Sequence, residues 1–181
     1  MLTSTSLTGT LESPYEAAPM GSPFFSAEEQ RVFDAKLSEI LAHYPPDRKG
    51  AAMLPALRLL QDIKGWLPPD GMVLVARALG VSPERAYEVA TFYVMFHTTK
   101  PGKHVVDVCT NLSCSLRGAE ELLVHLENRL GLKSGTSNER WTLRETECLA
   151  SCGTAPCLQV DEVHHENLTR GRVDAIFDQL S

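Results

Sequence analysis

Four of the five cysteines lie in two short loops, and paired thiols are well suited to holding a metal. Four residues separate the first pair, Cys109 and Cys114, and three separate the second pair, Cys148 and Cys152. Each pair directly follows a stretch with the residue pattern of a β-strand. Because loops anchored by rigid strands aim their side chains accurately, we interpret the four thiols as ligands of one site.

Three chemistries use cysteine pairs, and the spacing bears on each of them. Structural zinc sites usually place two residues between paired cysteines, a spacing that neither pair has. Disulfides form in oxidising compartments, and five cysteines leave one unpaired. An iron–sulfur cluster is wider than a single ion, and its four thiolates follow spacings that differ among families, which suits the longer loops. Spacing alone leaves the cluster and a zinc site open.

Composition and charge exclude several classes of function. The chain has 181 residues, with 17 basic and 23 acidic side chains, and its net charge of −6 argues against nucleic acid or an acidic membrane as the main partner. Its apolar runs are far shorter than the roughly 18 residues of a membrane span, so we expect no direct membrane insertion. The first basic residue is Arg31, whereas secretory and transit signals need earlier cations. We therefore expect a cytoplasmic location, where thiols stay reduced.

Apolar periodicity divides the chain into three parts. Residues 1–25 are rich in Ser, Thr, Pro and Gly and have no period, which predicts a flexible tail. Residues 26–99 carry four helical patterns, the first opened by a capping box at Ser26 and Glu29, and we predict an antiparallel helical bundle. Residues 100–181 show strand, helix, three strands and helix, which is typical of one sheet with helices packed against it. The predicted fold class is α+β.

The predicted elements position the cysteine loops. Four bundle helices are expected at residues 26–44, 48–64, 70–79 and 83–97, and the apolar stripe of the fourth helix usually indicates core. In the second part we expect strands at 105–108, 141–147, 157–160 and 163–166, helices at 116–130 and from 169, and a polar loop at 133–140. Because Cys114 precedes the helix expected at 116, the positive amino end of that helix should favour its thiolate.

The residues around the cysteines resemble a known family. Segments 109–122 and 147–156, with Val89–Tyr93 upstream and Glu166–Leu168 downstream, closely resemble the thioredoxin-like [2Fe-2S] subunit of respiratory NADH dehydrogenase, the E-type subunit of bacterial complex I. The likeness covers roughly residues 26–181. It implies a thioredoxin-like [2Fe-2S] ferredoxin domain at 100–181 and one cluster with the ligands Cys109, Cys114, Cys148 and Cys152.

The same resemblance implies a function. It indicates an electron-transfer subunit of NADH:quinone oxidoreductase, peripheral to the inner membrane, whose cluster exchanges single electrons with the FMN of a partner flavoprotein. We expect the NADH and FMN sites on that partner, and no catalytic residue here, because the sequence has no G-x-G-x-x-G fingerprint after a strand.

Other functions remain as alternatives. The chain is also similar to the equivalent subunits of NAD-linked formate dehydrogenases and hydrogenases, and a zinc-stapled interaction module without redox activity is a further possibility. A thiol–disulfide oxidoreductase is disfavoured, because the sequence contains no C-x-x-C.

Two positions depart from the family pattern. Ala150 stands where the family often has glycine, which would stiffen the second cysteine loop. Cys157 occupies a position that is usually aliphatic, and we interpret it as a small buried hydrophobe on a strand. His164 and His165 are neighbours on a predicted strand, so their side chains point to opposite faces, and we assign neither to the metal.

Overall fold

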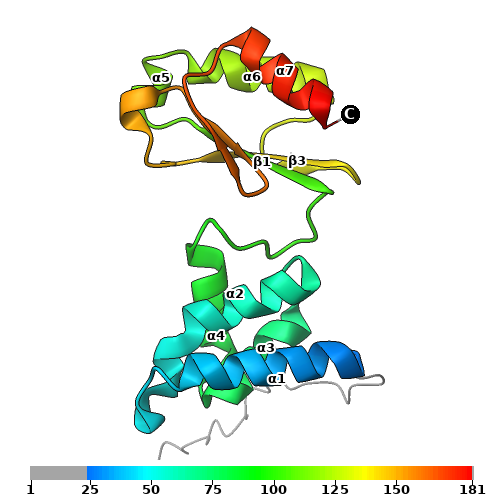
Figure 1. Cartoon of the computed structure of the whole chain (residues 1–181), viewed down its shortest axis with the longest axis vertical. Helices are drawn as coiled ribbons and strands as arrows, with labels where there is room; N and C mark the ends of the chain where they lie inside the picture. The colour runs from blue at the N-terminus through cyan, green and yellow to red at the C-terminus, as the bar shows by residue number, and fades with distance from the viewer. Residues whose placement is uncertain (1–23, 181) are drawn as a thin grey trace, which may run out of the picture. The chain divides into compact units, whose positions relative to one another are not determined.

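The computed structural model describes residues 24–180, which form two compact units divided after Thr98 (Figure 1). Most of the predicted tail, residues 1–25, lies outside the described residues. No helix among residues 24–180 has the length and apolarity that crossing a membrane requires. The described part of the first unit is helical, and its elements are α1 (Ala27–Leu41), η1 (Pro46–Ala52), α2 (Met53–Lys64), α3 (Pro69–Leu79) and α4 (Pro83–Phe92).

The first helix begins with the predicted capping box. The backbone N–H of Glu29 donates to the Ser26 hydroxyl over 3.2 Å, and the N–H of Ser26 donates to the Glu29 carboxylate over 2.8 Å, so two otherwise unpaired amides are satisfied. Lys64 at the end of α2 also bonds the Glu29 carboxylate, over 2.9 Å. Just before the cap, Phe25 is buried and its ring lies 5.0 Å from the ring of Phe33. These contacts fix α1 against α2.

The second predicted helix begins later than its pattern suggested. The segment Pro46–Ala52 is a 3-10 helix, and regular α-helix starts at Met53. Pro55 lies in the first turn of α2, where its missing amide removes no helical hydrogen bond. The apolar face of α2 joins the core of the unit, whose largest fully buried side chains are Leu57, Leu60, Leu67 and Val75.

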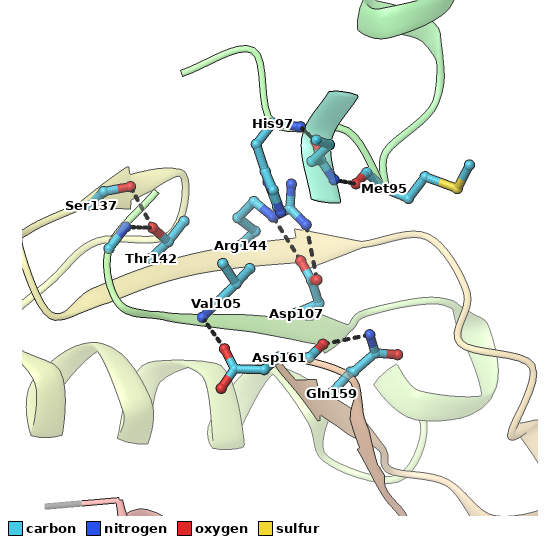
Figure 2. Close-up of polar contacts among 11 residues, drawn as sticks. Met95, His97, Val105, Asp107, Ser137, Thr142, Arg144, Gln159 and Asp161 are labelled. Atoms are coloured by element: carbon cyan, nitrogen blue, oxygen red, sulfur yellow. Dashed lines mark hydrogen bonds and ion pairs between the residues drawn. The ribbon is translucent and has the colours of Figure 1, made fainter. Parts of the chain in front are cut away.

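The fourth helix ends at Phe92, five residues before the predicted end at 97, so that prediction was wrong. Tyr93 turns to extended backbone, with φ −91° and ψ 117°. The cause lies in α2, where the Gln61 amide donates to the Met95 carbonyl over 2.9 Å and accepts from the His97 N–H over 2.8 Å (Figure 2). The Gln61 side chain thus gives the Met95 carbonyl and the His97 N–H the hydrogen-bond partners that a longer helix would have provided. Only part of the predicted apolar stripe of this helix lies in the core, because Tyr93 is exposed.

The second unit is one mixed sheet with helices on one side. Figure 1 shows its two longer helices on the same side of the sheet, and their apolar residues pack with those of the central strands. The sheet order is β2-β3-β1-β4-β5, with β1 parallel to β3 and the other pairs antiparallel. The elements are β1 (His104–Cys109), α5 (Leu112–Ser115), α6 (Ala119–Leu130), β2 (Thr136–Ser137), β3 (Trp141–Thr146), η2 (Cys152–Thr154), β4 (Leu158–Val160), β5 (Val163–His165) and α7 (Arg170–Gln179).

Two predicted boundaries in this unit were wrong. The helix expected at 116–130 begins at Ala119, because Gly118 adopts the left-handed conformation (φ 87°) and separates it from the four-residue helix α5. The loop expected at 133–140 contains β2, a two-residue edge strand paired with β3. The short helix α5 and the strand β2 are both too short to produce a periodic pattern.

Polar contacts lock the register of the central strands. Asp107 on β1 and Arg144 on β3 stand directly opposite each other, and the guanidinium binds both carboxylate oxygens, over 2.7 and 2.9 Å (Figure 2). At the other end of β1, the Asp161 carboxylate accepts from the N–H of Val105 over 2.9 Å. A bidentate pair between half-buried strands tolerates no slip of one residue.

We predict that two glycine substitutions in this unit have opposite effects. A Cβ on Gly102 would lie 2.6 Å from the backbone nitrogen of Trp141 and 2.7 Å from the Asn138 carbonyl, so Gly102→Ala should lower the free energy of unfolding by about 1–3 kcal/mol. A Cβ on Gly171 in α7 meets nothing within 4 Å, so Gly171→Ala should raise it by up to about 1 kcal/mol. Urea denaturation measures both, and equal effects would contradict the close approach at Gly102.

Candidate metal centre

The parallel pairing of β1 and β3 brings the two cysteine loops to one edge of the sheet. Cys109, the last residue of β1, stands opposite Thr146, the last residue of β3. The N–H of Thr110 donates to the Thr146 carbonyl over 3.2 Å, so the strands stay paired as the loops begin. Carboxyl ends of adjacent parallel strands lie side by side, and both loops therefore start from the same place.

The first loop buries its two thiols. Asn111 caps α5 by accepting from the N–H of Leu112 over 2.8 Å, and this short helix turns Cys114 inward. Cys109 and Cys114 are each 2% exposed. Helix α5 also packs beside the turn η2, which begins with Cys152. The fold thus places the two loops next to each other.

Cys157 joins this buried group, which the sequence interpretation did not anticipate. It is 1% exposed and directly precedes β4, and its carbonyl accepts from the N–H of Cys109 over 3.2 Å. The sulfurs of Cys114 and Cys157 are 3.7 Å apart. Within residues 24–180, the sulfurs of Cys109, Cys114 and Cys157 form a group of possible metal ligands that all lie within 4.8 Å of one another.

The second loop holds its thiols differently. Cys148 and Cys152 are exposed and lie outside the buried group of three sulfurs. Between them, Ala150 adopts the left-handed conformation (φ 61°), and its N–H donates to the Cys148 sulfur over 3.3 Å. The structure therefore brings together Cys109 and Cys114 of the four predicted ligands, and the full ligand set stays a prediction.

A polar cluster that sequence reasoning missed fixes the second loop to the β-hairpin. The Ser151 hydroxyl bonds the Glu166 carboxylate over 2.6 Å and the His164 ring nitrogen over 2.7 Å. Hydrogen bonds to this carboxylate, with that from Ser151 the strongest influence, hold the pKa of Glu166 below its usual value. Neither His164 nor His165 belongs to the thiol group. The hydrogen bonds of Ser151 restrain the backbone directly beside Cys152.

The three buried thiols differ in the direction in which burial and hydrogen bonding shift their pKa. Burial tends to raise the pKa of Cys109, but N–H donors from Asn111 and Leu149 outweigh it, and the pKa is lowered. Burial, reinforced by hydrogen bonding with Cys109, raises the pKa of Cys114. Burial also raises the pKa of Cys157. The expectation that a helix amino end favours the Cys114 thiolate was wrong, because Cys114 lies inside the short helix α5 and is desolvated.

The donor set fits an iron–sulfur cluster. All five cysteines are free thiols, and the buried group contains sulfur alone, without carboxylate or imidazole. Thiolates are the ligands of iron–sulfur clusters and of soft metals. Two further thiols on a neighbouring exposed loop give a donor set more spread out than one small ion needs.

We predict that Ala150→Gly stabilises the protein. The left-handed backbone at Ala150 strains an L-residue and suits glycine, so the substitution should raise the free energy of unfolding by about 1 kcal/mol. Ala175→Gly, on the exposed side of α7, is the matched control and should lower it by about the same amount. Chemical denaturation measures both, and destabilisation by Ala150→Gly would contradict the strain.

Comparisons with known proteins agree with the fold and with the predicted resemblance. The chain is 42% identical over 156 residues to a subunit of NADH-quinone oxidoreductase from Rickettsia conorii, covering 82% of this chain and 93% of that protein. It is 41% identical over 154 residues to NADH-quinone oxidoreductase subunit 2 of Thermus thermophilus, covering 82% and 85%.

A solved structure matches the fold. An NAD+-reducing [NiFe]-hydrogenase superposes with a TM-score of 0.59 at 21% identity, over 68% of this chain and 22% of that one. The model of the thioredoxin-like [2Fe-2S] ferredoxin family matches residues 37–181. The predicted α+β class and the predicted family are confirmed, and this chain belongs to the thioredoxin-like [2Fe-2S] ferredoxins.

Proposed function

We propose that this chain is the electron-transfer subunit of an NADH:quinone oxidoreductase and carries one [2Fe-2S] cluster. The observation that carries the proposal is the convergence of two cysteine loops at one edge of the sheet, in a chain about 40% identical to NADH-quinone oxidoreductase subunits over most of its length. The proposed ligands are Cys109, Cys114, Cys148 and Cys152.

The chain's own residues prepare the site for such a cluster. Backbone N–H groups of Asn111 and Leu149 stabilise negative charge on the Cys109 sulfur before any metal binds. The Ala150 N–H donates a hydrogen bond to the Cys148 sulfur. When bound, the cluster supplies a centre that takes up and releases one electron at a time.

The partner is proposed to be a flavoprotein that holds FMN and NADH. NADH gives up two electrons as a hydride, whereas a [2Fe-2S] centre accepts one, so a flavin must separate the pair. The sequence contains no dinucleotide fingerprint, and we therefore propose that the flavin is bound by another chain. Attachment to this partner would place the chain in the cytoplasm, peripheral to the inner membrane.

Exposed apolar side chains mark one surface on each unit that we assign to this partner. Leu112 is 71% exposed and Leu116 is 78% exposed, and they flank Cys114. In the helical unit, Phe92 is 77% exposed and Val94 is 64% exposed, at the point where α4 ends. Neighbouring exposed apolar side chains are typical of protein interfaces. We propose that the cluster loops face the flavin and that the helical unit adds docking surface.

We predict that the four proposed ligands act as a unit. Replacing any one of them by Ala should abolish or badly deplete the cluster, because each proposed ligand supplies one of the four metal–sulfur bonds. The measurements are iron and sulfide content and the visible absorption that dithionite bleaches. Cys157→Ala is the control, and it should retain its iron and lose about 1 kcal/mol of stability. A colourless protein that holds zinc after anaerobic expression would support the zinc-stapled module instead.

We predict that NADH oxidation requires the partner. The holoprotein alone should accept electrons from dithionite and show no NADH oxidation, because it lacks a hydride acceptor. Mixed with the flavoprotein, the cluster should be reduced by NADH. Stopped-flow absorption of the cluster measures this step. Robust NADH oxidation by this chain alone would contradict the assignment of the catalytic site to the partner.

Surface variants test the docking surface in the same assay. Leu116→Asp and Phe92→Asp should slow NADH-driven reduction at least tenfold without changing the cluster spectrum, since a charge in an apolar contact costs more than about 1.4 kcal/mol. Val124→Asp is the matched control, because Val124 is 53% exposed on the middle of α6, away from the cysteine loops. Equal effects of the three variants would argue against the assigned surface.

A further inference from the structure

The buried group contains one thiol more than the proposed ligand set. Cys157 is 1% exposed, and its sulfur lies 3.7 Å from the sulfur of Cys114. Its position is set by the sheet, because β4 pairs with β1 and the N–H of Cys109 bonds the carbonyl of Cys157 over 3.2 Å. The sheet therefore fixes the backbone position of Cys157 without help from a metal.

A [2Fe-2S] cluster has no coordination position for a fifth thiol. Such clusters take four cysteine ligands, and the proposed set already supplies them. A cysteine must lose its proton to bind metal, so Cys114 as a ligand can only accept a hydrogen bond. Cys157 keeps its proton, and its S–H is then the donor in the contact between the two sulfurs.

We propose that Cys157 is a positioning residue whose S–H donates to the Cys114 sulfur and raises the reduction potential of the cluster. This inference rests on the proposed function, since it takes Cys114 as a ligand. Reduction adds negative charge to the cluster and its thiolates. A hydrogen bond to a ligand sulfur stabilises that charge and therefore favours the reduced state.

One buried thiol also has hydrogen-bond donors that do not depend on the side chain of Cys157. The Cys109 sulfur has backbone donors from Asn111 and Leu149, which side-chain substitution at Cys157 leaves in place. The side chain at position 157 adds a further donor beside Cys114 and also contributes a side-chain hydrogen bond to Cys109. Replacing it thus changes the hydrogen bonding of these two sulfurs while the backbone donors remain.

Three substitutions at position 157 separate donation from packing. Cys157→Ala and Cys157→Val both remove the donor, and the first leaves a small cavity while the second refills it. Cys157→Ser restores a donor, the hydroxyl. The full chain is purified anaerobically with its cluster, and the reduction potential is titrated by visible absorption and by electron paramagnetic resonance. Pulsed resonance in D2O detects the exchangeable proton that couples to the reduced cluster.

The two variants without a donor should behave alike. Ala and Val are expected to bind iron as the parent chain does and to lower the equilibrium constant for one-electron reduction severalfold, where a tenfold drop corresponds to about 59 mV. They should also lose one exchangeable proton coupling. The Ser variant should recover both the potential and the coupling. A purely structural role predicts that Ala and Val differ and that Ser rescues neither.

Each other outcome has a definite meaning. If Ala and Val keep their iron, the parent potential and the parent proton coupling, the inference is wrong and the proposed function stands. If Cys157→Ala loses its iron, Cys157 is itself a ligand, and both the ligand set and the inference are overturned. If the parent chain takes up no cluster from iron and sulfide under anaerobic conditions, the proposed function itself fails.

Discussion

The parallel pairing of β1 with β3 is the constraint on which the rest of the site depends. It places Cys109 opposite Thr146, so the loops that follow the two strands leave the sheet at one edge. They do so although 38 residues separate Cys109 from Cys148, the first cysteines of the two loops. A slip of one residue would turn Cys109 to the other face. The bidentate contact of Asp107 with Arg144 opposes such a slip, and it therefore protects the cysteine geometry from a distance.

The two loops that this pairing brings together have different physical characters. The first buries both of its thiols, and desolvation raises the pKa of Cys114, which lies within α5. The second leaves its thiols exposed and is held by Ser151 through the hairpin. With the proposed ligand set, two ligands would be buried and two exposed, and the exposed pair would leave a route for electrons. This asymmetry agrees with a subunit that docks its loops on a partner.

Sequence reasoning predicted what local pattern encodes, and it failed where distant residues decide. The capping box of α1 and the family were predictable because Ser26, Glu29 and the cysteine segments carry the information themselves. The end of α4 was not, because the amide that ends it belongs to Gln61, more than thirty residues earlier. The break at Gly118 was missed because an apolar residue on each side continued the helical pattern. The contact of Cys157 depends on strand pairing, which no spacing rule reports.

The contact of Cys157 with Cys114 gives a buried structural position a proposed chemical role. A buried position beside β1 needs a small apolar side chain, and cysteine meets that need nearly as well as an aliphatic residue does. Unlike an aliphatic residue, it carries a proton that can be donated to whatever sulfur the sheet places nearby. The pairing of β4 with β1 fixes both Cys157 and Cys109, the last residue of β1, so one set of backbone hydrogen bonds places the proposed donor and one of the proposed ligands. Under the proposed assignment, packing and redox tuning share one physical origin in this chain.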